Sequence, residues 1–167
     1  LEFILAVILV MEDAGHEGTL VYVPEICGLG LTFTIDGFRV LYAAIACFMW
    51  MCTSLFSKEY FVHYRNRNRY HLFQLMTLGA TAGIFLSADL YTTFIFFEIM
   101  SISSYVWVAH DETGPSLRAA ETYLAVAIIG GLTLLMGLFL LYDQTGTLLI
   151  SELYEACQGK NVYPACI

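Results

Sequence analysis

Four long apolar runs, separated by short blocks of charge, constrain this chain more than any other feature. A helix needs about 17–25 predominantly apolar residues to cross the hydrocarbon of a bilayer. The spans are expected at about residues 40–56, 71–88, 90–109 and 117–142. Residues 36–147 are therefore predicted to form an all-α, polytopic bundle of transmembrane helices.

The composition supports a lipid environment and excludes several partners. Of the 167 residues, 59% are hydrophobic and 13% are charged, against about 25% charged in soluble domains. A net charge of -8 leaves no basic face for phosphates, so we expect no nucleic-acid partner. The expected partner is the lipid bilayer of a cell membrane (inner or plasma). The sequence shows no catalytic, nucleotide-binding or metal-binding spacing, so we expect no cofactor and no metal in this chain.

The regions outside the four spans have different patterns. Residues 1–11 are apolar but too short to cross, and we expect a truncated transmembrane helix. Residues 12–35 are acidic and contain two β-prone stretches, "VYV" and "LTFTI", which indicate an extracytoplasmic loop with a possible hairpin. Residues 148–167 are expected to be a truncated extracytoplasmic tail, and the chain to be a fragment. A disulfide between Cys157 and Cys166 is an open alternative to two free thiols.

Basic residues predict the orientation. The connection over residues 57–70 holds four of the seven Lys and Arg residues, and the positive-inside rule places such a loop in the cytoplasm. Alternation then places the turn at Asp89 outside and the segment "HDETGPS" inside. The basic loop is read first as a topology signal, and a docking surface for a cytoplasmic partner is the alternative.

Glu98 is a carboxylate near the middle of the third span. An ionisable group at mid-membrane costs about 2.5–3.5 kcal/mol, which the surrounding Phe and Ile residues offset at about 0.3–0.6 kcal/mol each. At 100° per residue, Tyr91, Ser101 and Tyr105 share an arc of about 80° with Glu98. A stripe of hydroxyls beside a carboxylate favours a hydrated path for protons or ions. The alternative is a structural hydrogen bond or ion pair to a neighbouring helix.

Other residues in the spans have more ordinary interpretations. Gly79 and Gly83 form a GxxxG pattern, and Gly130 with Gly131 lies in the fourth span, so all four are assigned to helix packing. Local loosening of the helix at Gly130 and Gly131 is the alternative. Glu121 lies three residues after Arg118 near the inner end of the fourth span, where a surface pair and a proton entry site explain it equally well. Asp36 is expected to cap or anchor the first span.

Three segments together resemble a known family. The segment "FLSADLYTTFIFFEIMSISSYVWVA" resembles the FxFWELMSLxSYxLI-type segment of the antiporter-like, proton-translocating membrane subunits. That family is shared by respiratory complex I, energy-converting membrane hydrogenases and Mrp-type sodium/proton antiporters. The stretches "LTFTIDGFRVLY" and "RAAETYLAVAIIGGLTLLMGLFLLYDQTGTL" are similar to its loop-to-helix "DG" segment and to its next helix.

The resemblance implies a protein of about fourteen helices with two inverted five-helix repeats, of which this chain holds roughly the second to the sixth. It implies that Glu98 is the acid of a half-channel. Its charge partner would be a Lys on the helix after the fourth span, outside this chain. It further implies other membrane subunits as partners, protons or sodium ions as cargo, and redox chemistry confined to those other subunits. No redox centre is expected here, so an enzyme activity of the chain itself is left open.

One position departs from the family pattern. Many members have a Lys or another charged residue in an AAxKYF-like segment, where this chain has Thr122 beside Glu121. Both residues are kept as candidates for a proton path. The departure favours a hydrogenase-type or Mrp-type subunit over a standard respiratory one. A non-conducting structural subunit, in which Glu98 only pairs helices, is the alternative function.

Overall fold

The computed structural model describes residues 19–24, 30–63, 67–160, 162 and 165. In chain order the elements are β1 (Thr19–Val23), β2 (Leu31–Ile35), α2 (Gly37–Tyr60), the 3-10 helix η1 (Phe61–His63), α3 (Arg67–Leu86), α4 (Leu90–Val108), α5 (Gly114–Thr145) and α6 (Ile150–Cys157). The expected helix over residues 1–11 lies outside the described residues, as does Cys166 of the possible Cys157–Cys166 disulfide.

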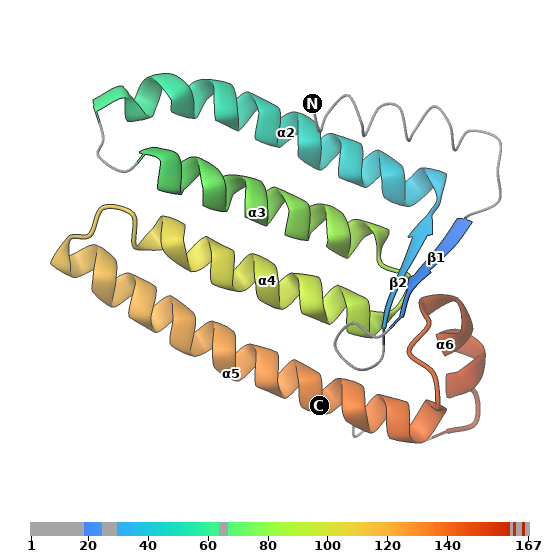
Figure 1. Ribbon diagram of the computed structural model, residues 1–167. Helices are drawn as coiled ribbons and strands as arrows, with labels where there is room; N and C mark the ends of the chain where they lie inside the picture. The colour runs from blue at the N-terminus through green and yellow to red at the C-terminus, as the bar shows by residue number, and fades with distance from the viewer. Residues whose placement is uncertain (1–18, 25–29, 64–66, 161, 163–164, 166–167) are drawn as a thin grey trace.

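The four long helices lie side by side in chain order, with α3 between α2 and α4, and α4 between α3 and α5 (Figure 1). Within the described part of the chain, α2 and α5 are long and apolar enough to cross a membrane by length and composition. Of the most apolar 18-residue stretch of each helix, only 22% is buried in α2 and 11% in α5. A core helix of a soluble protein would be largely buried, so these exposed apolar surfaces suit contact with lipid or with other helices.

The helix ends differ from the expected spans because local capping and tertiary contacts set them. Helices α2 and α5 extend past both ends of their expected spans. The first turn of α5 includes Gly114 and Pro115, and its N-cap is Thr113, whose side chain accepts from the Ser116 backbone N–H at 3.4 Å. At the other end, Gly146 adopts a left-handed φ of 78° and terminates α5. The short helix α6 is an element that the sequence did not indicate.

A two-stranded antiparallel hairpin lies at one end of the helices (Figure 1), with Val21 opposite Phe33. The turn between α3 and α4 is held between this hairpin and the segment before α6. The Ala88 N–H donates to the Thr32 carbonyl at 2.9 Å, and the Ala88 carbonyl accepts from the Ile150 N–H at 3.1 Å. Three segments far apart in the sequence are therefore joined through one short turn.

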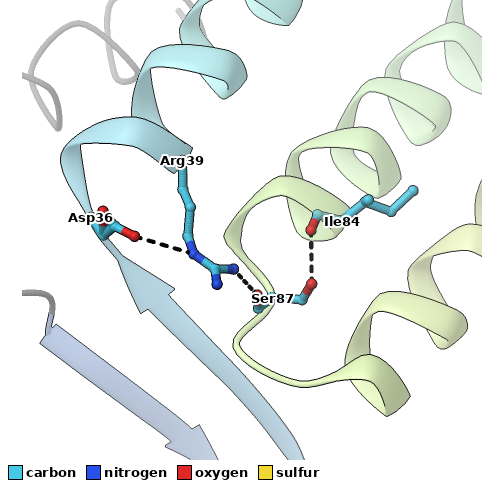
Figure 2. A network of polar contacts seen from close by, with 4 residues as sticks. All are labelled: Asp36, Arg39, Ile84 and Ser87. Carbon is cyan, nitrogen blue, oxygen red and sulfur yellow. Dashed lines mark hydrogen bonds and ion pairs between the residues drawn. The ribbon is translucent and has the colours of Figure 1, made fainter. Parts of the chain in front are cut away.

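Arg39 adds a side-chain link at the same end (Figure 2). Its Nε lies 3.3 Å from Asp36 Oδ2, and its Nη1 donates to the Ser87 carbonyl. Asp36 is the N-cap residue of α2 but makes no side-chain cap hydrogen bond. Its carboxylate therefore acts as an anchor for Arg39, and through it for the turn after α3. A cation in the first turn opposes the helix dipole, and these two contacts offset that cost.

The opposite end of the bundle carries the connections after α2 and after α4 (Figure 1). Arg69 Nη1 lies 2.6 Å from Glu112 Oε1, and Arg69 Nη2 donates to the His110 carbonyl at 3.4 Å. The Tyr70 ring stacks on Trp107 with ring centroids 5.9 Å apart. The start of α3 is thereby fixed to the end of α4. The described parts of the basic connection, residues 57–63 and 67–70, lie at this end together with the "HDETGPS" segment, while Asp89 and the hairpin lie at the other. Which end faces the cytoplasm stays a prediction.

Candidate functional site

Glu98 lies on the side of α4 that faces α5. The face of α4 that packs against α3 is identified by Phe96, whose ring lies against Gly83 of α3. Glu98 follows Phe96 by two residues, which is about 200° around the helix. Because α3 and α5 flank α4 (Figure 1), the carboxylate points away from α3 and toward α5.

The Glu98 carboxylate is in contact with α5 at Gly131. A methyl group on Gly131 would lie 2.8 Å from Glu98 Cδ and 2.9 Å from its Oε2. Gly131 is buried, whereas its neighbour Gly130 is exposed and faces open space. Gly130 and Gly131 therefore have different surroundings, although both were assigned to helix packing from the sequence.

One oxygen of the carboxylate is left without a partner. Glu98 Oε1 is buried and makes no hydrogen bond to any residue that the structure describes. The ion pairs among those residues are Arg39 with Asp36 and Arg69 with Glu112, which lie at the two ends of the bundle. Leaving a buried polar group unsatisfied costs about 1–3 kcal/mol, and more for a charged one. The described residues therefore supply neither a hydrogen-bond donor nor a cation to this oxygen.

The structure places two of the three predicted hydroxyl residues on the α5 side of α4. Ser101 is buried, and its carbonyl accepts from the Tyr123 hydroxyl of α5 at 3.4 Å. Tyr91 lines a cavity between α4 and α5. Tyr105 is half-buried in the same arc of α4. Tyr123 was missed by the sequence reasoning because it belongs to another helix and only interhelical packing brings it near Ser101.

The cavity beside Tyr91 has a volume of about 510 Å³ and begins one turn from the Glu98–Gly131 contact. Phe94 precedes Glu98 by four residues, and Leu135 follows Gly131 by four. Apart from the hydroxyls of Tyr91 and Tyr142, its lining side chains are apolar. Ordered water needs polar partners, and apolar cavities stay dry. The described residues therefore make a more polar surrounding on the Ser101 side of Glu98 than on the Tyr91 side.

Glu121 and Thr122 are not brought to Glu98. Both are exposed on α5, and the Thr122 hydroxyl donates to the Arg118 carbonyl of its own helix at 3.0 Å. Thr122 precedes Gly131 by nine residues, which places it on the opposite face of α5. Among the described residues no ion pair joins Glu121 to Arg118. Their roles in a proton path stay predictions.

The GxxxG pattern in α3 is asymmetric. A methyl group on Gly83 would lie 2.6 Å from atoms of the Phe96 ring, whereas a methyl group on Gly79 would meet nothing within 4 Å. Gly83 therefore permits the close approach of α4, which is what small residues do in packed membrane helices. Gly79 makes no such contact with the described chain.

Among the buried polar residues that sequence reasoning did not single out, Asp89 and Gln74 make interhelical or capping contacts. Asp89, read only as a turn, is 8% exposed and accepts hydrogen bonds from the Thr92 N–H, the Thr92 hydroxyl and the Thr32 hydroxyl. Gln74 is 1% exposed, and its Nε2 donates to the Ser54 hydroxyl at 3.0 Å. An Asp directly before an apolar helical run is a preferred N-cap residue, and this signal could have identified Asp89. Nothing in the local sequence marks Gln74.

Residues 87–165 match a family model described as "NADH:quinone oxidoreductase/Mrp antiporter, TM". A protein of Staphylococcus epidermidis named "Putative antiporter subunit mnhD2" is 32% identical over 126 residues, which is 74% of this chain and 25% of that protein. Its counterpart in Staphylococcus aureus is 40% identical over 88 residues, 52% of this chain and 18% of that protein. The chain thus spans a quarter or less of the length of the curated relatives it matches.

Three solved structures share the fold. A chain of the membrane-bound sulfane sulfur reductase, an archaeal respiratory membrane complex, matches 93% of this chain with a TM-score of 0.77 and 24% identity, over 32% of its own length. A chain of respiratory complex I from Thermus thermophilus matches 92%, with a TM-score of 0.75 and 21% identity, over 32% of its own length. A chain of the Mrp complex from Dietzia sp. matches 90%, with a TM-score of 0.75 and 23% identity, over 29% of its own length. The polytopic helical membrane fold expected from the sequence is confirmed by these matches, with the β1–β2 hairpin as its one sheet among the described residues.

Proposed function

We propose that this chain, which belongs to the antiporter-like family of membrane subunits found in complex I and Mrp complexes, translocates protons or exchanges sodium ions for protons. In this proposal Glu98 is the acid that binds and releases the proton. The single observation that carries this proposal is the buried Oε1 of Glu98, which makes no hydrogen bond to any described residue. Intramembrane carboxylates without a structural partner are functional candidates by default.

The proposed step is a change in the protonation of one carboxyl. Removal from water favours the neutral acid, and an approaching cation favours the carboxylate. A positive charge that moves toward or away from Glu98 would therefore release or recapture its proton. We assign that charge to a basic residue beyond the described chain, as the family resemblance implies. The proton would come from the Ser101 side, where the Tyr123 hydroxyl and the half-buried Tyr105 lie, because the other side opens on the apolar cavity.

The partners proposed for the working protein are other membrane subunits of a multi-subunit complex. Each of the three structures with this fold is a complex of that kind by its description. The Staphylococcus relatives favour an Mrp-type antiporter over a respiratory complex. The driving force would then be an existing ion gradient and not a redox reaction within the same complex.

The test replaces the acid in the complete protein that carries this chain. Glu98→Gln keeps the size of the side chain and removes its proton exchange. In vesicles reconstituted with the assembled complex, we expect proton translocation to fall to the level of empty vesicles, as followed by a pH-sensitive dye. Glu155→Gln, an exposed change in α6, is the matched control and should translocate normally. Parallel runs with and without sodium separate sodium/proton exchange from proton movement alone.

Two outcomes would refute the proposal. Full translocation by an assembled Glu98→Gln protein would show that the acid carries no proton. Loss of assembly in the Gln variant, with normal coupling in whatever assembles, would favour the non-conducting structural role instead. The amount of complex is measured by quantitative immunoblotting of the purified membrane, so that rate and assembly are separated.

A further inference from the structure

The position of Gly131 sets where the Glu98 carboxyl can lie. A methyl group on Gly131 would come within 2.8 Å of Glu98 Cδ and 2.9 Å of Oε2. Ordinary contact begins at 3.4 Å, so even the longer of these distances is 0.5 Å too short (3.4 − 2.9). The observed position of the carboxyl therefore exists only because residue 131 has no side chain.

The atoms that the methyl group would meet belong to the end of a flexible side chain. Glu has three side-chain torsions, so the carboxyl would swing away from α5 while the helices stay packed. At Gly83 the same addition would meet the ring of Phe96, which is rigid and has less freedom to move. An added methyl group at Gly131 therefore changes the position of an acid, whereas at Gly83 it strains helix packing.

Helix packing alone does not account for Gly131. The adjacent Gly130 would meet nothing within 4 Å, so two consecutive glycines are not needed to bring α4 and α5 together. Each glycine in a helix interior costs about 0.5–1 kcal/mol relative to alanine. At Gly131 that cost comes with space for a buried carboxyl whose Oε1 has no partner among the described residues.

We infer that Gly131 is a positioning residue for Glu98: it lets the carboxyl lie directly against the backbone of α5, and so fixes both its shielding from water and its distance from the cation that it meets during transport. This inference rests on the proposed function. It assigns Gly131 a role in proton exchange and Gly130 none.

The experiment compares Gly131→Ala with Gly130→Ala in the complete protein, assembled in its complex and reconstituted in vesicles. Both variants add one methyl group to the same helix and raise its helix propensity equally. Gly130→Ala should translocate at the normal rate with the normal pH profile. Gly131→Ala should assemble but translocate at least about tenfold more slowly, because a displacement of about 1 Å can cost 10²-fold in such sites. Its pH profile should shift, which an effect on packing alone would not produce.

Infrared difference spectroscopy gives a second readout. The carbonyl stretch of the protonated Glu98 is identified as the band that Glu98→Gln removes. We expect this band to shift in Gly131→Ala and to stay in place in Gly130→Ala, because its frequency follows the hydrogen bonding and polarity around the carboxyl. An unshifted band in Gly131→Ala would overturn the inference.

A double-mutant cycle keeps the inference testable even if Gly131→Ala assembles poorly. Glu98→Asp shortens the side chain by one methylene group, which withdraws the carboxyl from Gly131. Adding Gly131→Ala to Glu98→Asp should then change neither assembly nor rate, and the two effects should be strongly non-additive. Additive effects, or poor assembly that Glu98→Asp does not restore, would overturn the inference.

The two proposals fail in different ways. If Glu98→Gln translocates normally, the proposed function is wrong. If Glu98→Gln abolishes translocation while Gly131→Ala matches Gly130→Ala in rate, pH profile and infrared band, only the positioning role is wrong.

Discussion

Replacing Asp89 should destabilise the end of the bundle that carries the hairpin. Its Oδ1 accepts from the Thr92 N–H at 2.6 Å, and its Oδ2 accepts from the Thr92 hydroxyl at 2.7 Å and from the Thr32 hydroxyl. Thr92 is fully buried, and Asp89 is 8% exposed. One carboxylate therefore caps α4, benefits from the helix dipole and ties β2 to that helix.

The magnitude follows from these contacts. Loss of an N-cap side chain costs about 0.5–2 kcal/mol, and hydrogen bonds to a charged group contribute about 1.5–3 kcal/mol each. Because the two hydroxyls can turn to other acceptors, we expect Asp89→Ala to cost about 3–5 kcal/mol in total. Asp89→Asn keeps an oxygen for the Thr92 N–H and presents an amide donor to the hydroxyls, which can rotate to accept. We expect Asp89→Asn to cost about 1–2 kcal/mol.

The assay is thermal unfolding of the complete protein in detergent, with the unfolding midpoint read from intrinsic fluorescence. The unfolding midpoint should be highest for the wild type, lower for Asp89→Asn and lowest for Asp89→Ala. Asp111→Ala, an exposed change in the connection between α4 and α5, is the control and should unfold with the wild type. The reasoning is refuted if Asp89→Ala unfolds at the midpoint of Asp111→Ala, or if Asn is as damaging as Ala.

Two further predictions concern packing and the opposite end of the bundle. Gly83→Ala should destabilise by about 1–3 kcal/mol through overlap with Phe96, whereas Gly79→Ala should be neutral or stabilising by about 0.5–1 kcal/mol; equal unfolding midpoints for the two variants would contradict this. Arg69→Ala should cost no more than about 1 kcal/mol through loss of its pair with Glu112, because the two side chains are 37% and 56% exposed, and the effect should shrink in high salt. A loss that salt leaves unchanged would show that Arg69 contributes mainly by packing.

The presence and order of the helices could be predicted from the sequence because burial in lipid demands long apolar runs. Their ends could not, because single side chains and tertiary contacts decide them. Helix α2 begins at Gly37, where the chain leaves β2, and α5 begins directly after Thr113. The strands at "VYV" and "LTFTI" could be anticipated from β-prone residues. Their docking on Ala88 could not, because it depends on contacts between segments more than 50 residues apart.

The candidate site shows the same division. Glu98 could be identified from the sequence of one helix, because a carboxylate within an apolar run costs free energy to bury in a membrane and is therefore rare. Its contact with Gly131 depends on the rotation of α4 and α5 about their axes, and no pattern within either helix specifies that rotation. For the same reason, the sequence could not distinguish Gly83 from Gly79, or Gly131 from Gly130, although each pair differs sharply in what a methyl group would meet.

The surroundings of two other charged residues, Asp89 and Arg39, differ from those of Glu98. Asp89 is surrounded by donors, and the half-buried Arg39 reaches both a carboxylate and a carbonyl. If Glu98 served only to join α4 to α5, a donor at position 131 would satisfy it within the same bundle. The chain has a glycine there, and Oε1 makes no hydrogen bond to any described residue. A glycine at position 131 leaves the Glu98 carboxyl space but no hydrogen-bond donor. This arrangement is consistent with the proposed proton exchange, in which the cation that pairs with Glu98 approaches and leaves.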